Sequence, residues 1–173
     1  METKNRLKQC STYLITAQEY DESYKLLAPY IYTNGVLTIS SKKYMNLPVL
    51  DAQNQINNHL AFQIWINSEL SSAIVSTKYD RTKELLPYWK KGLRWLCNGH
   101  PVLHQLMEQT TGGPKDRFIR KKQLFKLVIN QPIVKNLIEC SYYLDKYGNT
   151  PAERCQTLWQ KEVIHEFTNS SNL

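Results

Sequence analysis

The stretch PVLDAQNQINNHLAFQIWINS, residues 48–68, decides the fold expected for this chain. Its apolar residues recur at the spacings of three and four that define one side of an α-helix. The members of this series are Ala52, Ile56, Leu60 and Ile64, followed by Ala61 and Trp65. Phe62 and Ile66 extend the apolar surface almost all round. The pattern therefore predicts one long helix at about 48–66, buried at the centre of the domain.

The middle of this predicted helix is unusually polar. It carries Gln53, Asn54, Gln55, Asn57, Asn58 and His59. Buried amides are costly unless they are hydrogen-bonded. We therefore expect either a polar network around the helix or a cavity that admits a ligand and water, and the sequence leaves both open.

The segments before and after the helix predict strands. The turn residues Asn34-Gly35 precede a β-rich run at 36–40, and 71–76 is a second short strand. The last third, 115–167, is expected to form strands at 124–130, 137–144 and 152–159, because Leu, Ile, Val, Tyr and Phe are frequent there. Residues 145–149 form the expected hairpin connection, and 162–167 forms a final strand or a closing helical turn.

The remaining segments predict helices. Residues 1–30 are expected to form a helical N-terminal segment, and a helical pair at about 82–111 is divided by Asn98-Gly99. The chain is thus expected to be a single domain, 1–173. Its order favours the α+β class, with an antiparallel sheet wrapped around one central helix.

Composition narrows the class of protein. The chain has 173 residues, 42% hydrophobic and 21% charged, which is enough apolar material for one core and argues against disorder. The net charge of +7 favours partners that carry phosphate or carboxylate, and nucleic acid, coenzyme A and acidic carrier proteins all remain open. No membrane span or secretory signal is visible, so a cytoplasmic location is expected.

Four short motifs, taken in order, resemble the FcoT-like family of hotdog-fold acyl thioesterases and related enzymes that act on enoyl-carrier-protein thioesters. The matching segments are Leu26–Tyr30, Tyr44, Asn58–Phe62 and Leu144–Gly148. The resemblance implies an enzyme that processes acyl-CoA or acyl-carrier-protein thioesters, without a cofactor, as a homodimer or larger assembly. The reaction is either hydrolysis or addition of an amine such as glycine to an enoyl thioester. Phe62 departs from a tyrosine of the family, and Val49 stands near a family asparagine.

The expected catalytic residues follow from what a thioester reaction requires. Negative charge develops on the carbonyl oxygen, and backbone amides near 49–53 at the helix N-terminus are suited to stabilise it. Asn58 is a candidate for orienting water or a small nucleophile, Tyr44 and Tyr30 for hydrogen-bonding the carbonyl, and His59 for the general base. Val49 and Phe62 are the candidate substrate-binding residues.

A basic run, KDRFIRKKQLFK at 115–126, contains six basic residues and one acid. Arg120, Lys121 and Lys122 are candidates for binding the phosphates of coenzyme A or phosphopantetheine. The same run supports an alternative, a basic non-catalytic module that binds nucleic acid or protein, with Phe118 and Phe125 interleaved along a nucleic-acid backbone. An accessory interaction protein without any reaction is a third alternative.

No metal site is predicted. His100, His104 and Glu108 are spaced to share one helix face, but no HExxH pattern accompanies them. The cysteines, Cys10, Cys97, Cys140 and Cys155, form no C-x-x-C pair and are expected to be reduced, buried thiols.

Overall fold

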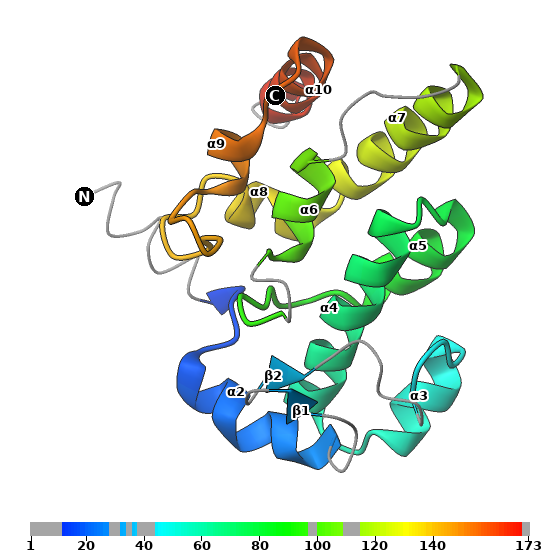
Figure 1. Cartoon of the computed structure of the whole chain (residues 1–173), viewed down its shortest axis with the longest axis vertical. Coiled ribbons are helices and arrows are strands. Elements are labelled where there is room, and N and C mark those ends of the chain that lie inside the picture. Colours follow the sequence, from blue (N-terminus) through cyan, green and yellow to red (C-terminus); the bar gives the residue numbers. More distant parts are fainter. Residues whose placement is uncertain are drawn as a thin grey trace.

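The computed structural model describes residues 12–27, 32–33, 36–37, 44–96, 100–108 and 115–170. Within these residues the protein is almost entirely helical (Figure 1). The helices are α2 (Ala17–Ser23), α3 (Val49–Gln55), α4 (His59–Val75), α5 (Tyr79–Leu85), α6 (Val102–Glu108), α7 (Lys115–Ile129), α8 (Pro132–Leu137), α9 (Pro151–Arg154) and α10 (Leu158–Ser170), with 3₁₀ turns η1 (Tyr24–Leu27) and η2 (Leu86–Tyr88). The strands described are β1 (Tyr32–Thr33) and β2 (Val36–Leu37), which pair antiparallel.

The prediction of a hotdog-like α+β fold is therefore wrong, and so is the resemblance to the FcoT-like family on which it depended. No sheet wraps a central helix in the described part of the chain. The predicted strand at 71–76 is the end of α4 and the turn after it, and 124–130 belongs to α7. The run at 152–159 spans α9 and the start of α10, and 137–144 follows α8 as turns.

The strand predicted at 124–130 followed from the types of residue there, whereas their spacing is that of a helix. Leucine, phenylalanine, valine and isoleucine suit a strand, but a half-buried strand would bury every second residue. Here the buried side chains are Leu124, Phe125, Val128 and Ile129, which lie on one side of a helix. Spacing was the better guide, because it records which face meets the core.

The predicted central helix at 48–66 is also divided in two. Ile56 and Asn58 have extended backbone conformations, so α3 ends and α4 begins within three residues. Gln53, Asn54, Gln55, Asn57, Asn58 and His59 are consequently exposed at this break. The buried helix is α4, which continues to Val75 and has buried residues on every side.

The predicted helical pair at 82–111 is only partly correct. The helix expected after Pro101 is confirmed as α6. Pro87, by contrast, lies in η2, and residues 89–96 form a connection without helix. The division expected at Asn98-Gly99 lies outside the described residues.

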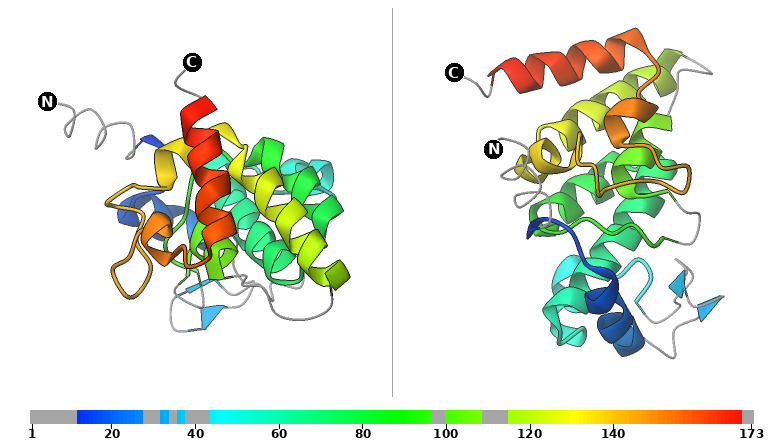
Figure 2. Two further views of the ribbon diagram at one scale, coloured as in Figure 1. Left: turned by 90° about the horizontal axis from the view of Figure 1, so that it is seen from above. Right: turned by 90° about the vertical axis from the view of Figure 1, so that its left-hand side faces the viewer.

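The helices stack in two rows (Figures 1 and 2). In the first row α2 contacts α4, α4 contacts α6, and α6 contacts α9. In the second row α5 contacts α7, and α7 contacts α10, while contacts between α4 and α5 join the rows. The helices thus pack both along each row and across the boundary between α4 and α5.

The connections between the helices stack in the same order. The Gly92 amide donates to the Tyr13 carbonyl at 2.7 Å, and the Ile15 amide donates to the Gly92 carbonyl at 3.0 Å. On the other side, Arg94 Nε donates to the Leu144 carbonyl at 3.1 Å. A β-carbon on Gly92 would lie 3.1 Å from side-chain atoms of both Leu137 and Tyr143, so a larger residue here would force these side chains to shift by a few tenths of an ångström.

One cluster of buried apolar side chains runs through the stack, from Leu14 to Cys155. In the described part of the chain, no helix combines the length and the apolar character that crossing a membrane requires.

Candidate functional site

The buried amides of α4 are Gln63 and Asn67, one helical turn apart, rather than the six predicted upstream. Asn67 Nδ2 donates to the carbonyls of Gln63 and Lys91, both at 2.8 Å. Its Oδ1 accepts from Trp89 Nε1 at 3.1 Å and from the Leu93 amide at 3.2 Å. Every polar position of this fully buried side chain is therefore occupied by protein groups.

Gln63 serves the same connection. Its Oε1 accepts from the amides of Lys90 and Lys91, and its Nε2 donates to the Tyr88 carbonyl at 2.8 Å. The two side chains thus satisfy the backbone of a buried, non-helical segment, which would otherwise be costly. Of the two outcomes left open by the sequence, a polar network is the one found around these amides.

Two of the four predicted catalytic residues, Asn58 and Tyr44, have structural partners. The Asn58 side chain accepts from the Ala61 amide at 3.0 Å and caps α4, and neighbouring His59 is exposed. Tyr44 is buried, and its carbonyl accepts from Trp65 Nε1 at 2.8 Å. Tyr30 lies outside the described residues.

The predicted substrate-binding residues fall in two places. Val49 is buried at the start of α3, where its amide donates to Glu84, and Phe62 is buried and stacks on Trp65. Arg120, Lys121 and Lys122 lie on α7. Because α3 and the start of α4 lie at one end of the stack and α7 lies toward the other (Figure 1), the structure divides the predicted site.

We expect the replacement Asn58→Ala to lower the free energy of unfolding by about 1 kcal/mol, because it removes the N-cap of α4. Urea unfolding measures this loss. Asn57→Ala is the matched control, since Asn57 is exposed and caps no helix. An equal loss in both variants would contradict the capping role.

A buried carboxylate, Glu69, joins α4 to the segment before α3. It accepts from the Asn46 amide at 2.6 Å and pairs with Arg81 at 3.3 Å. Arg81 also pairs with Glu84 and lies over the Trp65 ring. Burial raises the pKa of Glu69, although the Asn46 amide and Arg81 oppose the shift. With these partners, Glu69 is a tertiary anchor.

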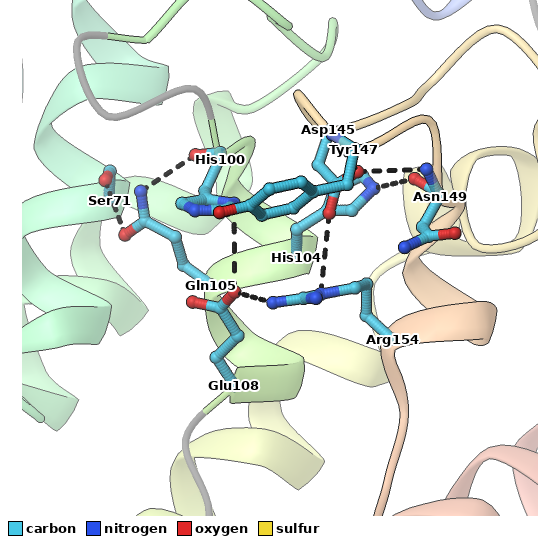
Figure 3. Close-up of polar contacts among 9 residues, drawn as sticks. All are labelled: Ser71, His100, His104, Gln105, Glu108, Asp145, Tyr147, Asn149 and Arg154. Atoms are coloured by element: carbon cyan, nitrogen blue, oxygen red, sulfur yellow. Dashed lines mark hydrogen bonds and ion pairs between the residues drawn. The ribbon is translucent and has the colours of Figure 1, made fainter.

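The largest polar cluster lies where α6 meets α9 and the turn before it (Figure 3). Asp145 is buried, and its Oδ1 accepts from the amides of Tyr147 at 3.0 Å and Asn149 at 2.9 Å. These two bonds hold the pKa of Asp145 below its usual value despite burial, with help from His104 and Arg154. The turn predicted at 145–149 is thus confirmed, but the strands expected on either side are absent.

Arg154 connects this turn to α6. Its guanidinium pairs with Glu108 and lies 3.4 Å from Asp145 Oδ2 through Nε (Figure 3). It also lies over the Tyr147 ring, and His100 Nδ1 is 3.7 Å from the same Glu108 oxygen. The four side chains around Arg154 therefore tie the two helices together.

His104 makes a second connection across the same boundary. Its Nε2 lies 2.7 Å from the Asn149 carbonyl, so this nitrogen carries the proton and donates. Burial lowers the pKa of His104, which favours the neutral ring. Beside it Tyr143 is fully buried, accepts from the Leu103 amide, and has a raised pKa because of burial.

The cluster around Asp145 holds α6 and α9 together and does not form a metal site among the described residues. Its groups are paired with one another, and no three His, Cys, Asp or Glu side chains among the described residues are arranged to hold a metal ion. The sequence pattern indicated the histidines, but it gave Asp145 only as part of a turn and did not indicate Arg154. The available signal was the Asp-x-x-Gly turn followed by the capping pair Thr150 and Glu153.

The cysteines differ from one another. Cys155 is a buried free thiol whose pKa is raised by burial, as predicted. Cys140 is disulfide-bonded, so the prediction of a reduced thiol is wrong there. Cys10 and Cys97 lie outside the described residues.

Three lysines of the basic run share one side of α7. This basic face consists of Lys115, Lys122 and Lys126, which make no salt bridge with any described residue. Arg117 and Arg120 lie about 120–180° away from them around the helix axis. Elsewhere the arginines Arg81 and Arg154 are paired with carboxylates. The basic face is therefore the one described concentration of cationic side chains left without anionic partners.

The aromatic residues of the run point away from that face. Phe118 and Phe125 both pack edge-on against Trp159 of α10, with ring centroids 5.9 and 5.1 Å away. Phe125 is buried, and Phe118 is half-buried. The exposed apolar residue on α7 is instead Ile119.

Comparison with known proteins found no matching family model, no similar curated protein and no similar solved structure.

Proposed function

We propose that this protein is a non-catalytic binding module that holds an acidic segment of another protein on the basic face of α7. The observation that carries the proposal is the set of cationic side chains without carboxylate partners on a helix whose other side is packed into the core. Such a face attracts anionic groups, and because α7 is packed into the core its backbone needs no further ordering when a partner binds.

The exposed residues favour a protein partner over a nucleic acid. Binding of single strands usually relies on aromatic rings that stack with bases. Phe118 and Phe125 are engaged with Trp159, and the group exposed among the basic residues is aliphatic Ile119. An acidic peptide with an apolar side chain complements this face better than a phosphate backbone does.

Acyl-thioester processing is not carried into this proposal. It rested on a groove between a sheet and a central helix, and the described residues contain no such sheet. The expected homodimer likewise depended on an exposed sheet edge.

We expect a labelled oligoglutamate peptide, about as long as the 15 residues of α7, to bind with an affinity that falls steeply with salt. The triple variant Lys115→Gln, Lys122→Gln, Lys126→Gln should bind about tenfold more weakly, since three ion pairs at the surface contribute about 0.5 kcal/mol each. Fluorescence anisotropy measures both effects.

The control variant is Lys78→Gln, Lys90→Gln, Lys161→Gln, which removes the same charge from exposed positions on other elements. It should bind like the unaltered protein. Equal losses in the two triple variants would contradict a site on α7. Tighter binding of a single-stranded oligonucleotide than of the peptide, at equal salt, would replace the acidic protein by a nucleic acid.

A further inference from the structure

Four exposed or half-exposed residues of α7 lie in a straight row. Lys115, Ile119, Lys122 and Lys126 follow one another at spacings of four, three and four. This spacing keeps side chains on one side of a helix and is the spacing of a coiled-coil seam. We call this row the heptad stripe; Ile119 within it is 45% exposed.

The length of the stripe distinguishes a helical occupant from an extended one. Its residues advance by a mean of about 5.5 Å per step, and the whole stripe is about 16 Å long. A partner helix repeats its side chains at the same interval. The side chains on one face of an extended chain recur about every 6.6 Å, so over three steps they drift out of register by about 3 Å.

The chemistry of the stripe defines the partner's face. Three ammonium groups require carboxylates opposite them, and Ile119 requires an apolar side chain. The Lys122 ammonium lies 5.9 Å from the centre of the Trp159 ring, so this end of the stripe borders α10. Asp116 and Gln123 lie beside the stripe, and the Asp116 carboxylate disfavours an acidic residue on that flank.

We infer that the partner segment is an acidic amphipathic helix of about three turns, which packs along the heptad stripe with an apolar residue against Ile119. This inference rests on the proposed function, since it specifies the conformation of the acidic segment.

The test uses two labelled peptides of equal composition and charge. The first is an alanine-rich helix former with glutamates and one central leucine on the same face. Both peptides contain the same residues, including prolines. The first carries its prolines at the two ends and forms a continuous helix. The second carries them at the centre, where they interrupt the helix. Anisotropy should show about tenfold tighter binding of the first peptide, and circular dichroism should show that its helicity rises on binding.

Ile119→Ser should weaken binding of the helical peptide about fivefold, as expected for partial burial of one apolar side chain, and should leave oligoglutamate binding unchanged. Leu158→Ser is the matched control, because Leu158 is 73% exposed on α10. Equal binding of both peptides would overturn the helical partner while leaving the basic face as a binding site. Binding of neither peptide nor of oligoglutamate would overturn the proposed function itself.

Discussion

Replacement of Asn67 by leucine is expected to lower the free energy of unfolding by about 3–5 kcal/mol. The change keeps the size of the side chain but leaves the indole N–H of Trp89, the amide of Leu93 and the carbonyl of Lys91 without their partner. Each buried polar group left unpaired costs about 1–3 kcal/mol, and part of that cost is relieved by local rearrangement. This makes Asn67 the most sensitive polar position of α4.

Urea unfolding followed by tryptophan fluorescence measures the loss, and Trp89 reports on the affected connection directly. Asn57→Leu is the matched control, because Asn57 is exposed in the break between α3 and α4. A loss in Asn67→Leu no larger than in this control would show that the amide does not hold residues 89–93 in place.

Replacement of Asp145 by asparagine is expected to cost about 2–4 kcal/mol near neutral pH. It weakens the bonds to the amides of Tyr147 and Asn149, and it leaves the buried side of Arg154 without its counter-charge. Because the α6–α9 boundary depends on the same groups, the last two helices should loosen before the rest of the stack.

The pH dependence of the free energy of unfolding distinguishes a role of the Asp145 charge from a role of its packing alone. The pKa of Asp145 is lower in the folded protein than in the unfolded chain, where it is about 3.9. Its contribution to stability is therefore complete above that unfolded value and is lost as the pH falls through the lower, folded pKa. Asp145→Asn should flatten the acid limb of the stability curve, whereas Asp21→Asn, at an exposed position of α2, should not. An unchanged acid limb in Asp145→Asn would contradict the role assigned to this carboxylate.

His104 adds a second, separate change with pH. Its pKa is lowered in the folded protein, so the unfolded chain takes up a proton first, near its ordinary pKa of about 6.5. Stability consequently falls as the pH drops below that value, and this decline should persist in Asp145→Asn.

Parts of the fold followed from local pattern. The helix after Pro101 and the turn at 145–149 are confirmed, because each of these features depends on residues close in sequence. The helix predicted at 48–66, by contrast, is found as two helices, α3 and α4. The predictions of strands at 124–130 and 152–159 are wrong. At 124–130 the residue types favour a strand, but the spacing of the buried residues Leu124, Phe125, Val128 and Ile129 is that of a helix.

Some features of the candidate site could likewise be predicted from local sequence, and others depend on contacts between distant residues. The basic run was recognised from composition, but the direction of Phe118 and Phe125 depends on where α10 places Trp159. Gln63 and Asn67 were overlooked because an amide inside an apolar run gives no sign of its partner, and theirs lie more than 20 residues away. The sequence marks Asp145 only as a turn residue, since its contact with Arg154, and the contact of Arg154 with Glu108, depend on tertiary packing.

By itself, the order of amino acids determined that a strongly apolar helix lies at the centre and that a cationic segment follows it, because periodicity and charge are properties of neighbouring residues. Only the tertiary structure decided that the helices stack in two rows and which amides are buried. Those outcomes depend on contacts between distant segments, whose free energies are absent from any local pattern.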